Sequence, residues 1–268
     1  MNVQPFATEV RGLTLRGTHY LPGDPSPTGP VAPRTTAVLL HGFGGSRVET
    51  TGVFVTLARA LVAAGIGVVA FDRAGHGESD GEFFDTTASG DIADTRDVLA
   101  AVRALPEVDA DDVHLVGMSL GSVIAAAVAA EEADVRSLTM WSTASVFVDD
   151  IRAGQIQGRS LAALDAPGGF FDFFGMRMGP AMRDDALGFD PYARAAAYRG
   201  PALLLHGTAD FVPLRCAERY TQADVFGERA ELVVVEGADH GWAQLPQRDD
   251  LIARTVSFIQ NHSERTAS

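Results

Sequence analysis

Hydrophobic and polar positions alternate in blocks along the chain. Short runs rich in Val, Leu and Ile recur between longer segments whose apolar residues follow helical spacing. The short runs are apolar throughout, which is typical of strands covered by helices on both faces. The candidate strands are Ala37–Leu40, Val68–Phe71, Val113–Gly117, Ser137–Trp141, Ala202–Leu205 and Leu232–Val235. The longer segments predict helices at about Gly52–Ala64, Ser89–Leu105, Leu120–Ala130, Arg215–Ala223 and Asp249–His262. This alternation predicts an α/β fold with a mostly parallel central sheet flanked by helices.

Two segments depart from this alternation. The first twenty residues have the pattern of an antiparallel hairpin, and the prolines and glycines of the following PGDPSPTGPVAP predict a surface loop. Between Ser145 and Pro191 we expect no strand, but a glycine-rich cluster of Phe and Met, GGFFDFFGMRMGPAM, is present. Long irregular segments inside compact domains are commonly lids or binding elements. We therefore predict one domain over residues 1–268 with a lid insertion at 145–191. A second interpretation, that these phenylalanines complete a small helical core, stays open.

Composition narrows the possible functions. The length of 268 residues and the 46% share of hydrophobic residues suffice for one sizeable core. The net charge of -14 opposes binding to nucleic acid and to anionic membranes. All cationic side chains are Arg, which excludes a P-loop lysine, a Schiff-base lysine and a Ser-Lys dyad, and the single Cys216 excludes an internal disulfide. No signal-peptide pattern or membrane-spanning run is found, so we expect a cytoplasmic protein; the pattern carries no signal for an oligomeric state.

The pattern G-x-S-x-G occurs twice, around Ser79 and around Ser119. With 28 glycines in the chain, the pattern alone is weak evidence for catalysis. A nucleophilic serine of this kind needs a sharp turn between a strand and a helix, where small neighbours permit a strained backbone and expose the hydroxyl. Ser119 meets this requirement, because a strand ends at Gly117 and the helix-forming run SVIAAAVAA follows Gly121. The helix N-terminus also places free N–H groups beside the hydroxyl, so we predict that Ser119 is the nucleophile.

The surroundings of Ser79 predict a different role. Its pentapeptide GESDG follows an AGHG loop and leads into EFFDTT rather than into a helix. The flanking carboxylates of Glu78 and Asp80 would raise the cost of a developing oxyanion. We therefore predict that Ser79 supports a turn.

Two later loops supply the partners of a catalytic serine. The acid and the base are expected in the chain order Ser, Asp or Glu, His, on loops at the carboxyl ends of later strands. Asp210 follows the strand PALLL in HGTAD, and His240 follows ELVVV in EGADHGW. Asp239 is adjacent to His240, but neighbouring residues rarely point so that one accepts from the other's Nδ1–H, so it is expected to bond within its loop. The remaining histidines begin a strand, precede the serine or lie away from a suitable loop: His19, His41, His76, His114, His206 and His262.

The predicted roles follow from this arrangement. Ser119 attacks the acyl carbon, His240 takes and returns its proton, and Asp210 holds the imidazole tautomer and stabilises its cation. An oxyanion hole needs one donor from the residue after the nucleophile and one from the loop after an early strand. Leu120 is the first candidate. Phe43 is the second, because the glycines of HGFGG let backbone N–H groups approach a substrate closely.

These blocks together resemble the α/β-hydrolase superfamily. HGFGG, FDRAGHGESDGEF, VGMSLGS, HGTADFVP and EGADHGW appear in its order, from about Thr35 to His262. Within the superfamily, the chain is similar to the cinnamoyl or feruloyl esterase group, and related acylaminoacyl-peptidase-like hydrolases share some of the same blocks. The similarity lies in the HGF start, the GHGESDGEF loop, the helix beginning SGDIADTRDVLAAV and the GADH ending. The resemblance implies an α/β-hydrolase fold, a serine esterase with a small insertion that selects the acyl group, and a non-catalytic serine in the GHGxSDG loop. Met118 and Leu120 stand where the esterase group commonly has His and Gln, which makes this elbow more apolar.

The predicted activity is hydrolysis of small-molecule carboxylic esters with an apolar acyl or aryl group, through an acyl-enzyme on Ser119 and without cofactor or metal. The candidate pocket residues are Met118, Phe170, Phe171, Phe173, Phe174 and Met176. Asp149, Asp150 and Asp172 are further candidates as polar anchors, although a solvated surface carboxylate is the commoner role. Three alternatives stay open: a peptidase or amidase with the same triad, a cofactor-free haloperoxidase or perhydrolase, and, least favoured, a non-catalytic binding module on this fold.

Overall fold

The central sheet organises the molecule. The computed structural model describes residues 1–23, 33–132 and 134–263. Within these residues, eight strands form one sheet in the order β1-β2-β4-β3-β5-β6-β11-β12. Their bounds are β1 (Asn2–Val10), β2 (Leu13–Leu21), β3 (Arg34–Leu40), β4 (Gly67–Phe71), β5 (Val108–Met118), β6 (Val135–Trp141), β11 (Ala202–Gly207) and β12 (Ala230–Val235). All neighbours from β4 to β12 are parallel, whereas β2 pairs antiparallel with both β1 and β4. The predicted mostly parallel sheet and the N-terminal hairpin are confirmed.

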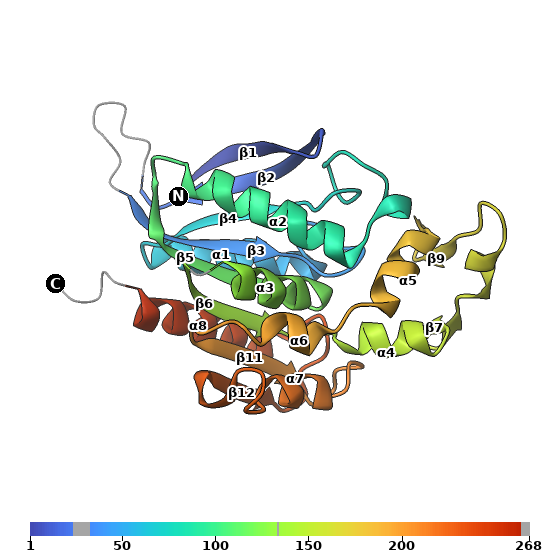
Figure 1. Cartoon of the computed structure of the whole chain (residues 1–268). Coiled ribbons are helices and arrows are strands. Elements are labelled where there is room, and N and C mark those ends of the chain that lie inside the picture. The colour runs from blue at the N-terminus through green and yellow to red at the C-terminus, as the bar shows by residue number, and fades with distance from the viewer. Residues whose placement is uncertain (24–32, 133, 264–268) are drawn as a thin grey trace.

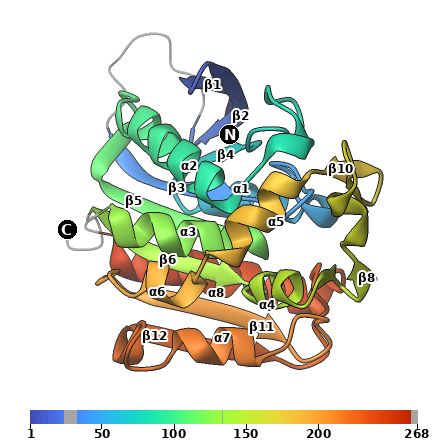
Figure 2. The same ribbon diagram turned by 45° about the vertical axis from the view of Figure 1, so that its right-hand side comes forward.

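Helices cover both faces of this sheet (Figures 1 and 2). One face carries α1 (Val53–Ala63) and α8 (Leu245–His262), and the other carries α2 (Ala88–Arg103), α3 (Leu120–Glu131) and α6 (Pro191–Ala195). The helix α7 (Arg215–Tyr220) contacts β11 and β12. Three short 3-10 helices join these elements: η1 (Thr50–Gly52), η2 (Phe83–Asp85) and η4 (Gly227–Arg229). The parallel strands are therefore covered on both sides, as their continuous apolar runs predict.

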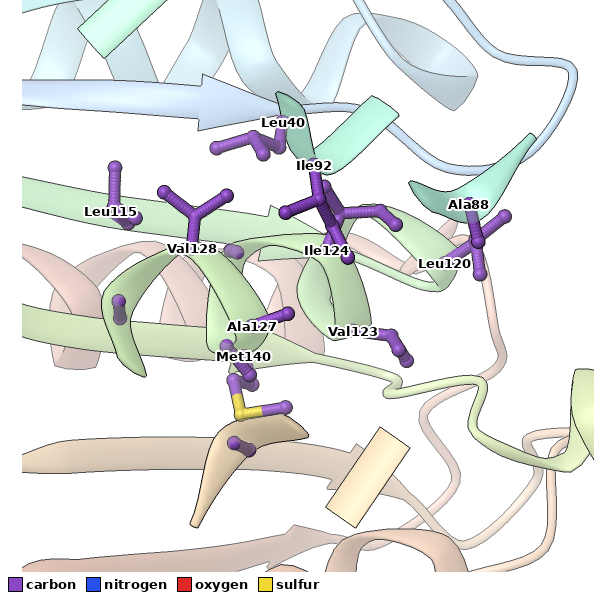
Figure 3. Packing of buried hydrophobic residues seen from close by; sticks show 14 of the residues in the cluster. Leu40, Ala88, Ile92, Leu115, Leu120, Val123, Ile124, Ala127, Val128 and Met140 are labelled. Atoms are coloured by element: carbon purple, nitrogen blue, oxygen red, sulfur yellow. The ribbon is translucent and has the colours of Figure 1, made fainter. Parts of the chain in front are cut away.

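The helix α3 lies deepest in the core. Ten of its twelve residues are buried, so the helix is apolar on all sides rather than on one stripe. Figure 3 shows Leu120, Ile124 and Val128 of this helix among side chains of β3, β5, β6 and α2. The turn between β5 and α3 is consequently held by close packing on both of its arms.

Two helix boundaries differ from the expected ones. The helix α8 begins at Leu245 rather than at about Asp249, because Pro246 occupies its first turn, where the missing N–H costs nothing. The helix α7 ends at Tyr220, before the expected Ala223, and the following residues form turns.

Residues 145–191 hold short elements of both kinds. These are α4 (Val146–Arg152), β7 (Gln155–Ile156), β8 (Arg159–Ser160), η3 (Ala162–Asp165), β9 (Phe171–Phe173), β10 (Met176–Met178) and α5 (Pro180–Leu187). The expectation that this segment contains no strand is wrong. Each strand has only two or three residues, too few for an alternating pattern to be visible. The turns Gln157-Gly158 and Phe174-Gly175 have positive φ at both positions, as two-residue hairpin turns require.

The position of this segment matters for function. In Figure 1 it projects beyond the carboxyl ends of the parallel strands, the edge at which α/β proteins place their ligands. The predicted loop PGDPSPTGPVAP lies, for residues 24–32, outside the described part of the chain. No helix in the described part has both the length and the apolar character needed to cross a membrane.

Candidate active site

Ser119 occupies a strained turn between β5 and α3. Its backbone has φ 55° and ψ −122°, a region that non-glycine residues rarely adopt. The glycines on either side make this turn possible. A Cβ on Gly121 would lie 2.3 Å from the carbonyl oxygens of Leu40 and His41, and a Cβ on Gly117 would lie 2.4 Å from the Cα of Ser122. The turn therefore holds the half-buried Ser119 hydroxyl at the end of the strand, as an elbow requires.

The structure brings the three residues predicted for catalysis into one hydrogen-bonded line. His240, on the loop after β12, places Nε2 3.0 Å from Ser119 Oγ. Its other ring nitrogen, Nδ1, lies 2.8 Å from Oδ1 of Asp210, on the loop after β11. In this geometry Nδ1–H donates to the carboxylate, which leaves Nε2 free to accept the serine proton. The arrangement can activate a serine hydroxyl by general-base catalysis.

The Asp210 carboxylate is buried, whereas the His240 side chain is 18% exposed. Burial favours the neutral form of Asp210, but the hydrogen bond and the charge interaction with His240 outweigh burial and lower the pKa of this carboxyl. Oδ1 also accepts the backbone N–H of Val212 at 2.8 Å. The carboxylate is thus ionised and oriented toward the imidazole.

Neighbouring acids and histidines take other positions. Asp239 accepts the backbone N–H of Ala243 at 2.9 Å, which is the loop role expected for it. His114 has an acid and a hydroxyl of its own, with Asp112 at 3.0 Å and Ser137 at 2.6 Å. These three side chains are fully buried, so this second set of His, Asp and Ser is part of the core.

The two residues predicted to supply oxyanion donors lie at the cavity beside Ser119. Phe43, in the loop after β3, and Leu120, the first residue of α3, both line the cavity beside Ser119. Among the described residues, neither backbone N–H has a hydrogen-bond partner. Unpaired N–H groups at such a position suit a developing negative charge.

The loop that carries Phe43 is fixed by hydrogen bonds on Gly42. The Gly42 carbonyl accepts Arg73 Nη2 at 2.8 Å and His41 Nδ1 at 2.8 Å, and the Gly42 N–H donates to the Glu49 carboxylate. Arg73 also pairs with Asp91 inside the protein. Burial raises the pKa of Asp91 to about 6, against the opposing charge of Arg73. Four buried side chains therefore position this loop.

His76 holds the same loop from the other side. Its Nε2 accepts the Gly44 N–H at 3.3 Å, and its Nδ1 lies 2.9 Å from the Ala74 carbonyl. Burial and the nearby Arg73 lower the pKa of His76 to about 3. Burial and Arg73 also lower the pKa of His41 well below its usual value. Both rings are therefore neutral, and each keeps an acceptor nitrogen: Nε2 of His76 accepts the Gly44 N–H, and Nε2 of His41 accepts the Arg73 N–H at 3.0 Å.

Ser79 is part of a turn that docks on β2. Its Oγ accepts the Arg16 backbone N–H at 2.8 Å and donates to the Asp72 carbonyl at 2.6 Å. Asp80 accepts the Thr14 N–H at 3.0 Å and pairs with Arg16. The Ser79 hydroxyl thus donates its proton to the scaffold and accepts from it, and Ser79 does not line the cavity at Ser119.

The cavity beside Ser119 has a volume of about 750 Å³. Its wall combines the loop after β3, the elbow, the loops after β11 and β12, and residues of the 145–191 segment. Of the predicted pocket residues, the wall includes Met118, Phe173, Phe174 and Met176. Phe43 packs on Phe173 with ring centroids 4.8 Å apart, which joins the predicted donor loop to the segment.

Two predicted pocket residues are not in the wall, and the prediction is corrected for them. Phe171 is 3% exposed and packs in the core beneath the Arg159 guanidinium, 4.8 Å from the ring centroid. Phe170 lies at the surface beneath Arg177. Of the three acidic candidates only Asp150 lines the cavity, and Asp172 instead accepts the Gly175 N–H in the hairpin turn.

Several wall residues were not anticipated: Glu49, Phe147, Ile156, Phe211 and Arg215. Phe211 had a detectable signal, because it directly follows Asp210 in HGTADFVP. Its ring is 59% exposed and lies 4.2 Å from the His240 ring, centroid to centroid. In the described part of the chain, no three His, Cys, Asp or Glu side chains are grouped so that they could hold a metal ion.

Comparisons with known proteins identify the family and the fold. The model of the alpha/beta hydrolase family matches residues 37–255. Est1E from Butyrivibrio proteoclasticus, solved with ferulic acid bound, superimposes with a TM-score of 0.83 at 20% identity, over 96% of this chain and 98% of that one. The esterase domain of a Rhodothermus marinus protein gives 0.71 at 21% identity, over 98% and 99%. A monoacylglycerol lipase from Paleococcus ferrophilus gives 0.66 at 22% identity, over 93% and 99%.

At these identities the structural similarity concerns the fold. A search of curated proteins finds no significant match.

Proposed function

Because the chain belongs to the alpha/beta hydrolase family, we propose that it is a serine hydrolase that cleaves carboxylic esters with an apolar acyl or aryl group. The observation that carries this proposal is the hydrogen-bonded line from Ser119 through His240 to Asp210, which ends at a largely apolar cavity. The family supports hydrolysis in general. The ester substrate and the acyl-enzyme are our inference from the site.

The proposed reaction uses each group at a defined step. Ser119 Oγ attacks the acyl carbon while His240 Nε2 takes its proton, and the carbonyl oxygen becomes an oxyanion near the Phe43 and Leu120 N–H groups. His240 then gives the proton to the leaving alcohol, and an acyl-enzyme on Ser119 remains. Water attacks this ester with the same base, which releases the acid and restores the hydroxyl. Asp210 keeps the imidazole in the required tautomer throughout and stabilises its cation.

The wall of the cavity supports an apolar acyl or aryl group. Phe43, Phe147 and Phe173 form a joined aromatic cluster at its side, with centroid distances of 5.7 and 4.8 Å from Phe43. Met118 adds an apolar side chain next to the nucleophile. Pockets of this composition bind an apolar body and orient it with a few polar groups. We propose that residues 145–191 act as a lid within the same domain and select the acyl group.

A panel of substrates tests this function. It combines p-nitrophenyl esters of increasing acyl length, methyl hydroxycinnamates, since Est1E is seen with ferulic acid, and anilides matched to the best ester. We expect ester hydrolysis with kcat/KM rising over several carbon atoms of the acyl chain, and much slower anilide hydrolysis. Absence of ester hydrolysis by folded protein, or faster anilide cleavage, would overturn the proposal.

A matched pair of variants tests the role of the acid. Asp210→Asn keeps the shape of the side chain but favours the wrong imidazole tautomer, so kcat should fall by roughly 10³- to 10⁴-fold. Asp239→Asn is the control, because Asp239 bonds only within its loop, and its kcat should stay within a few-fold of the wild type. Equal losses in both variants would contradict the assignment.

A further inference from the structure

Arg215 is the only arginine among the described residues that line the cavity at Ser119. It is the first residue of α7 and follows the loop that carries Asp210 and Phe211. Its side chain is exposed. A cationic residue therefore lines a cavity whose wall is otherwise largely apolar.

Arg215 has no hydrogen bond or ion pair with any described residue. The contrast with Arg219, one turn later in α7, is direct: that guanidinium makes two hydrogen bonds to Asp224, at 2.8 and 2.6 Å. The chain has 35 acidic and 21 basic side chains, so acidic partners are in excess. An arginine without a partner among the described residues therefore lines this cavity, although acidic side chains are in excess.

The two carboxylates in the same wall are already engaged. Glu49 accepts the N–H groups of Gly42 and Thr50. Asp150 accepts the Gln157 N–H at 2.9 Å. Neither is within ion-pair distance of Arg215. Of the Arg, Asp and Glu side chains of this wall, Arg215 is thus the one with no hydrogen-bond or ion-pair partner among the described residues.

We infer that Arg215 binds a carboxylate at the end of the substrate remote from the scissile bond, so that the preferred ester has an apolar body and an anionic terminus. This inference rests on the proposed function. The planar guanidinium offers parallel N–H donors that match a carboxylate. Asp150 and Glu49 repel an anion elsewhere in the cavity, which leaves Arg215 as the favourable position and fixes the direction in which the substrate lies.

Substrates that differ only in charge test this inference. In one arm, mono-p-nitrophenyl esters of dicarboxylic acids are compared with p-nitrophenyl esters of neutral acids of equal length. In a second arm, 4-carboxyphenyl butyrate is compared with 4-carbamoylphenyl butyrate, which moves the carboxylate to the alcohol side. We expect the wild type to prefer the charged ester in one arm. In that arm Arg215→Gln should lower the charged-to-neutral ratio of kcat/KM by roughly 10-fold, the effect of one exposed charge-assisted contact.

Two further variants sharpen the result. Arg215→Lys keeps the charge without the planar fork and should restore part of the ratio. Arg59→Gln is the matched control, because Arg59 also has no partner among the described residues but lies on α1 outside the wall, and its ratio should equal the wild-type value. The wild-type preference should weaken as salt is added, and the Arg215→Gln ratio should not.

The outcomes separate this inference from the proposed function. If neutral esters are not hydrolysed by the wild type, the proposed function fails. If they are hydrolysed but neither arm shows a preference that depends on Arg215, only the present inference is overturned. Arg215→Gln could instead lower kcat/KM equally for charged and neutral esters, and Asp150→Asn could do the same. That result would show that Arg215 contacts the opposite wall of the cavity, and it would also overturn the present inference.

Discussion

The pentapeptides GMSLG and GESDG share a pattern but build different structures. In the first, Ser119 stands at a positive φ between a buried strand and a buried helix, and its hydroxyl meets His240. In the second, Ser79 lies in a turn, and its hydroxyl bonds the backbone of Arg16 and Asp72. The difference teaches that the neighbouring elements, and not the pattern, decide whether a serine is available for chemistry.

The final glycine of each pattern has its own cause. Gly121 is required because helix α3 packs directly on the end of β3, where a Cβ would contact two carbonyl oxygens at 2.3 Å. Gly81 is favoured because its backbone has φ 96°, while the nearest atom to a Cβ there, Gly75 N, is at 3.2 Å. Gly121 is therefore needed because another segment packs too closely for a side chain, and Gly81 because its backbone has a positive φ.

The largest expected effect separates the two serines by activity. Ser119→Ala removes the proposed nucleophile, and kcat for the best ester should fall by roughly 10⁴-fold or more. Ser79→Ala should keep most of the activity and instead lower the free energy of unfolding by about 1–2 kcal/mol, through the loss of two hydrogen bonds. Ester kinetics and urea denaturation on both variants measure this. Retained activity in Ser119→Ala with lost activity in Ser79→Ala would reverse the comparison.

The next effect separates the two glycines by stability. Gly121→Ala forces a Cβ into backbone atoms that cannot move freely, so we expect a loss of about 3 kcal/mol in the free energy of unfolding. Gly81→Ala adds a side chain at positive φ without such an overlap and should cost about 1 kcal/mol. Urea unfolding followed by circular dichroism gives both values. A smaller loss for Gly121→Ala than for Gly81→Ala would show that the elbow is not tightly packed.

The most gradual effect is a pH dependence of stability that arises in the GHGESDG loop. The pKa of His76 is about 3 in the folded chain and near 6.5 when unfolded, so the unfolded chain binds more protons between these values. Stability should therefore be complete above pH 6.5 and fall as the pH drops toward 3, with His76 contributing a slope of up to about 1.4 kcal/mol per pH unit. Denaturation between pH 7 and 4 should show a shallower slope for His76→Gln and an unchanged slope for Ser79→Ala. Equal slopes in the wild type and His76→Gln would contradict a neutral, buried His76.

Continuous apolar runs made the sheet and its covering helices predictable. Burial on both faces demands apolar residues at every strand position, and this signal is local in the sequence. Ser119, Asp210 and His240 were also predictable, because each lies in the turn or loop that follows a parallel strand, and the carboxyl ends of parallel strands meet at one edge. Their distances of 2.8 and 3.0 Å are findings of the structure.

Other features depend on contacts between distant segments. The two short hairpins in residues 145–191 carry too few residues for a periodic signal. The bonds that hold the Phe43 loop join Arg73 to Gly42 and His76 to Gly44 across some thirty residues, and no local pattern marks them. The position of Arg215 in the cavity wall likewise arises only when α7 and the 145–191 segment are folded onto the same edge.

Labelling with a fluorophosphonate tests the central claim most directly, because the probe forms a bond only with a serine activated by its neighbours. After proteolysis and mass spectrometry, we predict one adduct per chain on the peptide that contains Ser119, and none on the peptide that contains Ser79. Labelling should disappear in Ser119→Ala and persist in Ser79→Ala. An adduct on Ser79, or folded wild-type protein that takes up no label, would contradict the account.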